Sequence, residues 1–173
     1  MDCYINELAP EIKGEGTKEI SISIEHSFNV KPAYFEIYSN HNKWILYRNS
    51  APLLSDVIQA VKMYSKRSLS INEIANNKEI LQCIHKKCDI HKYELNKEET
   101  LIVKKFLEKK LPEVKKLPFG LDGHNYAVAI NSDNRKYHCW CVIPKEWTVL
   151  GELIEMVVKK TELPDYYLAS ISE

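Results

Sequence analysis

The sequence predicts an α+β domain in which helices pack on one face of an antiparallel sheet. Strand-like alternation of apolar and polar residues occupies residues 1–48, helical periodicity occupies residues 50–116, and a hairpin followed by a helix occupies residues 117–173. Strands and helices that are segregated along the chain are typical of α+β domains. With 173 residues, 45% of them apolar, the chain is long enough for one core, so we expect a single domain over residues 1–173.

The first strands are predicted from a two-residue period. Residues 19–28 read EISISIEHSF, so isoleucines alternate with small polar residues and one face of this strand is apolar. Two further strand-like runs follow at residues 33–39 and 43–48, and the NHN sequence at residues 40–42 suits the turn between them. We expect the three strands to form an antiparallel meander.

The period becomes helical after Ser50. Pro52 suits the first turn of a helix, and apolar residues recur at helical spacing from Leu53 to Tyr64. This pattern predicts a helix over about residues 52–66. A second apolar stripe predicts a helix over about residues 77–88.

Two capping boxes mark further helix starts. Ser70 with Glu73, and Asn96 with Glu99, have the three-residue spacing in which each side chain of the pair bonds the backbone N–H of the other residue. The first box predicts a short helix. The second predicts a helix that runs to about residue 110.

The last unit is predicted to be a hairpin followed by a helix. One strand runs to about residue 131, the SDN sequence at residues 132–134 forms a tight turn, and a partner strand covers residues 136–143. Thr148 is expected to cap a helix that ends near residue 160. Its predicted core-facing residues are Leu150, Leu153, Ile154, Val157 and Val158.

Overall charge does not favour nucleic acid or an anionic membrane as the partner, because 24 Lys and Arg balance 24 Asp and Glu. The charge is nevertheless uneven. Residues 1–30 carry six acidic and two basic side chains, residues 144–173 carry six acidic side chains and three lysines, and residues 86–116 carry ten lysines and six acids. The lysines of the middle are interleaved with acids, which indicates a solvated helix surface rather than a nucleic-acid site.

Neither a secretory signal nor a membrane span is predicted. The first residues lack the basic and apolar regions of a signal peptide, and nowhere do eighteen apolar residues run together. We therefore expect a cytoplasmic protein with no membrane partner. Its five cysteines are expected to stay reduced in that compartment.

One group of residues has the composition of a zinc site. Cys83, His85, Cys88 and His91 fall within nine residues, and thiolate and imidazole are good zinc ligands. Their spacing matches no standard zinc module, and reduced cysteine is more often a small buried residue. We predict no metal and no cofactor, and keep a zinc-binding protein or a small Cys/His-dependent enzyme as the alternative function.

A catalytic thiol would need a base and usually a third group that orients the base. The candidate thiols are Cys139 and Cys141, and the candidate bases are His124, His138 and His26. The candidate orienting group is Asp122. Alternation places both cysteines on the core side of their strand. The chain also lacks the GxGxxG, GxxxxGK[ST] and GxSxG motifs. We therefore predict that the protein is not an enzyme.

The two acidic ends favour a protein partner. If they converge on one side of the fold, they form a negative face suited to a basic partner. Tyrosines that follow a helix-ending proline are expected to be exposed anchors for an interface. The predicted partner-binding residues are Glu7, Glu11, Glu15, Glu162, Asp165, Tyr166 and Tyr167.

The last unit has a recognisable order of residues. A turn and strand begin at Leu121-Asp122-Gly123-x-x-Tyr126, the second strand contains Trp140, and Pro144, Trp147, Leu150 and Leu153 lead into the closing helix. This pattern, over about residues 117–163, resembles small uncharacterised bacterial proteins that include immunity proteins of contact-dependent and other polymorphic toxin systems. The resemblance implies a protein that binds a cognate toxin domain and occludes its active site. It implies no catalytic residue.

Overall fold

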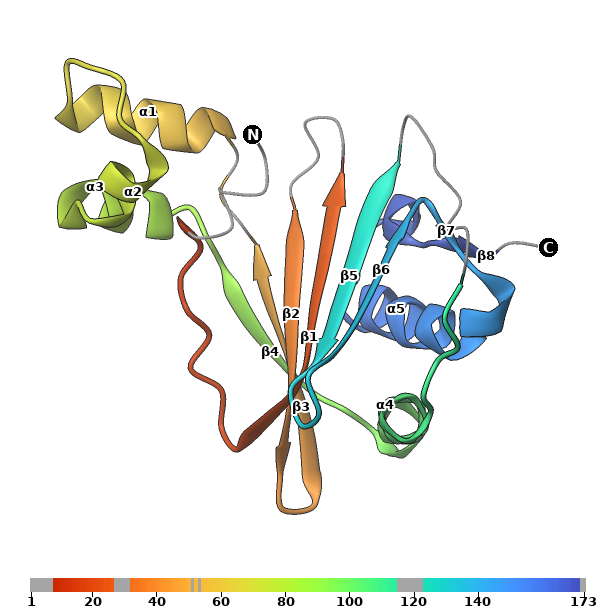
Figure 1. Cartoon of the computed structure of the whole chain (residues 1–173). Helices are drawn as coiled ribbons and strands as arrows, with labels where there is room; N and C mark the ends of the chain where they lie inside the picture. Colours follow the sequence, from red (N-terminus) through yellow and green to blue (C-terminus); the bar gives the residue numbers. More distant parts are fainter. Residues whose placement is uncertain (1–7, 27–31, 51, 53, 115–122, 172–173) are drawn as a thin grey trace.

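The structure is a computed structural model that describes residues 8–26, 32–50, 52, 54–114 and 123–171. Six strands form one antiparallel sheet in the order β4-β3-β2-β1-β5-β6 (Figure 1). Helices pack against it, so the predicted α+β class is confirmed. The strands are β1 (Thr17–His26), β2 (Ala33–Asn40), β3 (Lys43–Ser50), β4 (Ile90–Glu94), β5 (His124–Ile130) and β6 (Arg135–Trp140).

The order of the strands joins the two predicted strand units. β1, β2 and β3 form the expected meander, β5 and β6 form the expected hairpin, and β1 pairs with β5 to make one sheet. The prediction of an all-helical middle is wrong at β4, which pairs with β3 at the edge of the sheet. Most residues of β4 are exposed, so this strand has no alternating apolar pattern by which to recognise it.

The helices begin and end close to the predicted residues. Both capping boxes are formed, by Ser70 with Glu73 and by Asn96 with Glu99. The helices are α1 (Leu54–Tyr64), α2 (Ile71–Ala75), α3 (Lys78–His85), α4 (Lys97–Glu108) and α5 (Thr148–Lys160). Among these described helices, none has the length and apolar character that crossing a membrane requires.

The start of α5 differs from the prediction. A short 3-10 helix, η2 (Lys145–Trp147), runs directly into α5, so Thr148 is the first helical residue and not its cap. The Thr148 hydroxyl instead donates a hydrogen bond to the Lys145 carbonyl oxygen, 2.6 Å away. After α5 come η3 (Asp165–Tyr167) and β8 (Ser170–Ile171), and β8 pairs in parallel with β7 (Val142–Ile143).

The main core lies between one face of the sheet and helices α4 and α5 (Figure 1). We call this the covered face. All five predicted core residues of α5 are buried in it, together with Val103 and Phe106 of α4. Helices α1, α2 and α3 form a second, smaller apolar cluster, which Leu8 joins. This cluster lies beyond the ends of β3 and β4.

Residues 8–16, which we call the strap, cross the opposite face of the sheet, the open face (Figure 1). Ile12 of the strap packs in a small buried cluster with side chains of β2 and β3. Asn49 of β3 donates a hydrogen bond from Nδ2 to the Pro10 carbonyl oxygen, 2.7 Å away. These contacts place the strap over β2, β3 and β4.

The second half of the strap lies very close to the sheet. Gly14 lies directly against the ring of Tyr38, where a Cβ would overlap the ring. Glu15 forms an ion pair with Lys92 of β4, with 2.8 Å between Oε1 and Nζ. Gly16, with φ of +103°, then turns the chain into β1. The strap is therefore an integral part of the open face.

Candidate functional site

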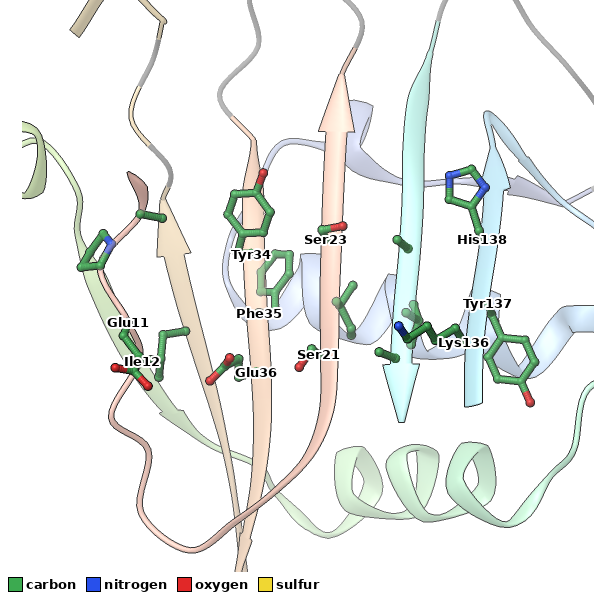
Figure 2. A pocket seen from close by; sticks show the side chains of 16 residues that line it. Glu11, Ile12, Ser21, Ser23, Tyr34, Phe35, Glu36, Lys136, Tyr137 and His138 are labelled. Atoms are coloured by element: carbon green, nitrogen blue, oxygen red, sulfur yellow. The ribbon is translucent and has the colours of Figure 1, made fainter. Parts of the chain in front are cut away.

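The open face contains a groove whose floor consists of small side chains. Ser21 and Ser23 of β1 lie beside Ala129 and Ala127 of β5, because the antiparallel register pairs Ser21 with Ala129 and Ser23 with Ala127. All four side chains are partly exposed. The groove above them has a volume of about 550 Å³ (Figure 2). The described residues leave this part of the sheet uncovered.

Longer side chains form the two walls of the groove. One wall is made by β2 and the strap, and the other by β6, so the floor strands β1 and β5 lie between them (Figure 2). The register aligns wall and floor residues in two rows across the four strands. The rows are Glu36-Ser21-Ala129-Lys136 and Tyr34-Ser23-Ala127-His138.

The wall on the β2 side, which we call the acidic wall, is lined by two carboxylates, and one of them is ion-paired. The Glu36 carboxylate forms an ion pair with Lys18, with 2.9 Å between Oε1 and Nζ, and accepts a hydrogen bond from the Tyr38 hydroxyl at 2.7 Å. Burial, and then the bond to Glu36, raise the pKa of Tyr38 well above its usual value, so its hydroxyl stays protonated as a donor. Glu11 of the strap adds an exposed carboxylate to the same wall. The network holds the Glu36 carboxylate in a fixed position.

The wall on the β6 side is basic. Lys136 and His138 are two residues apart on β6, so both side chains lie on the open face, and both are exposed. Lys136 is positively charged at neutral pH, and His138 adds an imidazole that can donate or accept a hydrogen bond. The groove therefore has walls of opposite character on either side of a nearly neutral floor.

A third row of residues lies beyond the groove, toward the start of β5. The register aligns Glu25 of β1, Asn125 of β5 and Trp140 of β6. Glu25 accepts a hydrogen bond from the Tyr34 hydroxyl at 3.2 Å, which links it to the acidic wall. The Asn125 Oδ1 atom is buried and accepts no hydrogen bond within the described part of the chain. This row places an aromatic side chain, Trp140, next to one end of the groove.

The predicted acidic face is not assembled as expected. Glu7 lies outside the described residues. Glu11 and Glu15 belong to the strap on the open face. Glu162 and Asp165 follow α5 on the opposite side of the sheet, where Arg48 Nη1 donates a hydrogen bond to the Thr161 carbonyl oxygen at 3.1 Å. The sheet therefore separates the two acidic groups.

The two predicted tyrosine anchors differ in exposure. Tyr166 is exposed, as expected. The prediction is wrong for Tyr167, whose side chain is only 4% exposed and whose carbonyl oxygen accepts a hydrogen bond from the Tyr126 hydroxyl at 3.1 Å. Burial raises the pKa of Tyr167 to about 12. The 3-10 turn η3 directs its ring inward, beside the ring of His124.

The candidate zinc residues lie on different elements. Cys83 and His85 are on α3, where Cys83 packs against the smaller apolar cluster, and His91 is exposed on β4. Cys88 lies between them and donates a weak hydrogen bond from Sγ to the Ile84 carbonyl oxygen at 3.5 Å. Across the ranges that the structure describes, no three His, Cys, Asp or Glu side chains are grouped as metal ligands.

The hairpin cysteines have different environments. Cys139 is fully buried on the covered face, as predicted, and burial raises the pKa of its thiol to about 12. A thiol with that pKa is almost entirely protonated at neutral pH and is a poor nucleophile. Cys141 does not continue the predicted alternation, because its φ of 59° ends β6. The side chain of His26 and the whole of Asp122 lie outside the described residues.

Comparison of the chain with protein-family models, with curated proteins and with solved structures gives no match. The groove must therefore be interpreted from its own geometry. Sequence reasoning missed it because its floor depends on the pairing of β1 with β5, which lie about a hundred residues apart. The available signal was the run of small residues on the polar side of each strand, Ser21 with Ser23 and Ala127 with Ala129.

Proposed function

We propose that this protein is a cytoplasmic bacterial immunity protein, which binds a cognate toxin domain and blocks its active site without catalysing a reaction. The observation that supports protein binding is the groove on the open face, with its small floor and oppositely charged walls. The resemblance of residues 117–163 to immunity proteins supports the choice of a toxin domain as the partner.

The open face is large enough for a specific interface. Five strand spacings of about 4.8 Å make the six-stranded sheet roughly 24 Å wide, and its strands of five to ten residues are roughly 17–33 Å long. The footprint is comparable to the ~800 Å² that each partner contributes to a typical stable interface. The strap occupies part of this area and presents its own surface to a partner.

The open face is also rigid, which favours tight binding. Its strands are held from behind by the main core, and the Tyr38 ring and Glu36 carboxylate are fixed by hydrogen bonds. Little conformational entropy is lost when a preorganised surface binds. The acidic wall would select a basic surface, such as the substrate cleft of an enzyme that acts on phosphate esters, and repel acidic ones.

The proposal predicts that a toxin domain is encoded beside this gene, and co-expression of the two chains tests it. Cells that express both chains should survive, cells that express the toxin domain alone should die, and the two purified chains should elute together in size-exclusion chromatography. Glu11→Lys on the acidic wall should reduce protection, whereas Glu155→Lys on the exposed surface of α5 should not. Failure of the wild-type chain both to protect cells and to bind the toxin domain would contradict the proposed function.

A further inference from the structure

We propose that the groove binds one α-helix of the partner, which lies along the strands with a basic flank against Glu11 and Glu36 and an acidic flank against Lys136 and His138. The inference deepens the proposed function, on which it rests for the partner being a protein. It specifies the secondary structure and the charge pattern of the bound segment.

The width of the groove matches a helix. The walls stand on β2 and β6, which are separated by β1 and β5, so the axes of the two strands that carry the walls are three strand spacings or about 14 Å apart. An α-helix with its side chains is about 10–12 Å across. An extended peptide occupies only about 5 Å of width, the spacing of one strand, and would leave most of the floor exposed. One helix therefore fills the space between the walls.

The floor allows the helix to approach closely. Ser21, Ser23, Ala127 and Ala129 are the smallest side chains with a Cβ, whereas the wall residues Tyr34, Glu36 and Lys136 are long. The two serine hydroxyls can bond to polar groups of the helix without adding bulk. The bound helix is expected to present small or apolar residues to this floor.

The walls determine how the helix is oriented about its axis. A helix that places Lys or Arg beside the exposed Glu11 and Asp or Glu beside Lys136 satisfies both walls at once. A helix with the same charge on both flanks meets repulsion at one wall, whichever way it runs. The walls therefore favour a helix whose two flanks carry opposite charges. Repulsion of helices with the same charge on both flanks gives specificity.

The third row distinguishes the two ends of the groove. Trp140 follows His138 on the open face of β6, and the unpaired Asn125 Oδ1 acceptor lies beside it on β5. Tryptophan is a frequent anchor of interfaces, so the Trp140 end of the groove offers a contact that the other end lacks. One end of the bound helix is expected to contact this row.

Three stapled helical peptides of about 15 residues, each with a central alanine stripe and a fluorescent label, can test the proposal. One has Lys on one flank and Glu on the other, one has Lys on both flanks, and one has Glu on both. By fluorescence anisotropy at low salt, the peptide with opposite flanks should bind about 10-fold more tightly than either uniform peptide. Equal binding of the three peptides, or no binding of any, would overturn the proposal.

Two variants locate the binding to the groove. Ala127→Leu raises the floor and should weaken binding of the opposite-flank peptide by about 10-fold, because its side chain occupies the contact stripe. Lys136→Glu makes both walls acidic, so this variant should prefer the peptide with Lys on both flanks. Lys105→Glu on α4, on the other side of the sheet, is the matched control and should change neither preference. Unchanged preference in Lys136→Glu would overturn the assignment.

The peptide experiment and the toxin experiment can succeed or fail independently of each other. Peptide selectivity without protection from the toxin would retain the helix groove and reject the immunity function. Protection that Ala127→Leu leaves intact would retain the immunity function and reject the groove. Light scattering provides a third result. If the wild type is a dimer and Ala127→Leu is a monomer, the groove binds a second copy of this chain, and the proposal of a helix from another protein is contradicted.

Discussion

The two faces of the sheet differ in chemistry although they alternate along the same strands. On the covered face, Ile20, Ile22 and Ile24 of β1 are at most 2% exposed and pack under α4 and α5. On the open face, their neighbours Ser21 and Ser23 are partly exposed and form a groove. A two-residue period lets one strand stabilise the fold with one set of side chains and form the floor of an open groove with the other.

The largest expected effect is on the covered face. Phe106 of α4 is fully buried, with its ring centroid 5.8 Å from that of Tyr137. Phe106→Ala removes this packing and leaves a cavity, so it should lower the free energy of unfolding by roughly 3–5 kcal/mol. Urea denaturation followed by circular dichroism measures the loss. A loss below about 1 kcal/mol would mean that α4 contributes little to the core.

A smaller effect is expected where the strap meets the open face. Asn49 is 3% exposed and bonds the Pro10 carbonyl oxygen at 2.7 Å. Asn49→Ala leaves that carbonyl without its partner and should cost about 1–3 kcal/mol. Limited proteolysis at Lys13 should become faster because the strap is held less firmly. The matched control is Asn76→Ala, which removes an exposed side-chain bond to the Asn72 carbonyl oxygen and should have a much smaller effect on proteolysis.

Helix α2, which is part of neither face, provides a reference for purely local stabilisation. Its N-cap residue Ser70 accepts a hydrogen bond from the Glu73 backbone N–H at 3.3 Å. Ser70→Ala should cost about 1 kcal/mol, as for other N-cap serines. In the co-expression experiment, this variant should still protect against the toxin. Loss of protection without unfolding would extend the binding surface to the α1–α3 cluster.

Acid should weaken the same capping box. Hydrogen bonds from Ser70 and Arg67 lower the pKa of Glu73 from 4.5 to about 2. Because the folded pKa lies below the unfolded one, the contribution of Glu73 is present above pH 4.5 and is lost as the pH falls through about 2. Carbon-13 NMR of the Glu73 carboxylate should therefore show titration well below the usual range. Glu73→Gln should flatten the acid limb of the stability curve, and an unshifted titration would contradict the capping geometry.

Local patterns in the sequence predicted the elements, because each has a signal within a few residues. Alternation identified β1, the capping boxes identified α2 and α4, and helical spacing identified the buried face of α5. The edge strand β4 was missed because exposed edge residues need not alternate. Tyr167 was assigned to the surface because the 3-10 turn that directs it inward leaves no clear pattern.

The groove could be predicted only in part, because it depends on contacts between distant segments. The serines of β1 were recognised as its polar face. Their pairing with Ala127 and Ala129, and the path of the strap beside them, follow from the tertiary fold. Glu11 was chosen for its charge and does lie at the groove, whereas Glu162 and Asp165 share that charge and lie on the other side of the sheet.

The most direct test of the division between the two faces is Ala127→Leu, measured for stability and for protection against the toxin domain. Because Ala127 faces outward over the groove floor, the melting temperature should stay within about 2 °C of the wild type. Binding of the toxin domain should nevertheless weaken by about 10-fold or more, and protection should fall with it. A variant that melts like the wild type and still protects fully would show that the open face is not the binding surface.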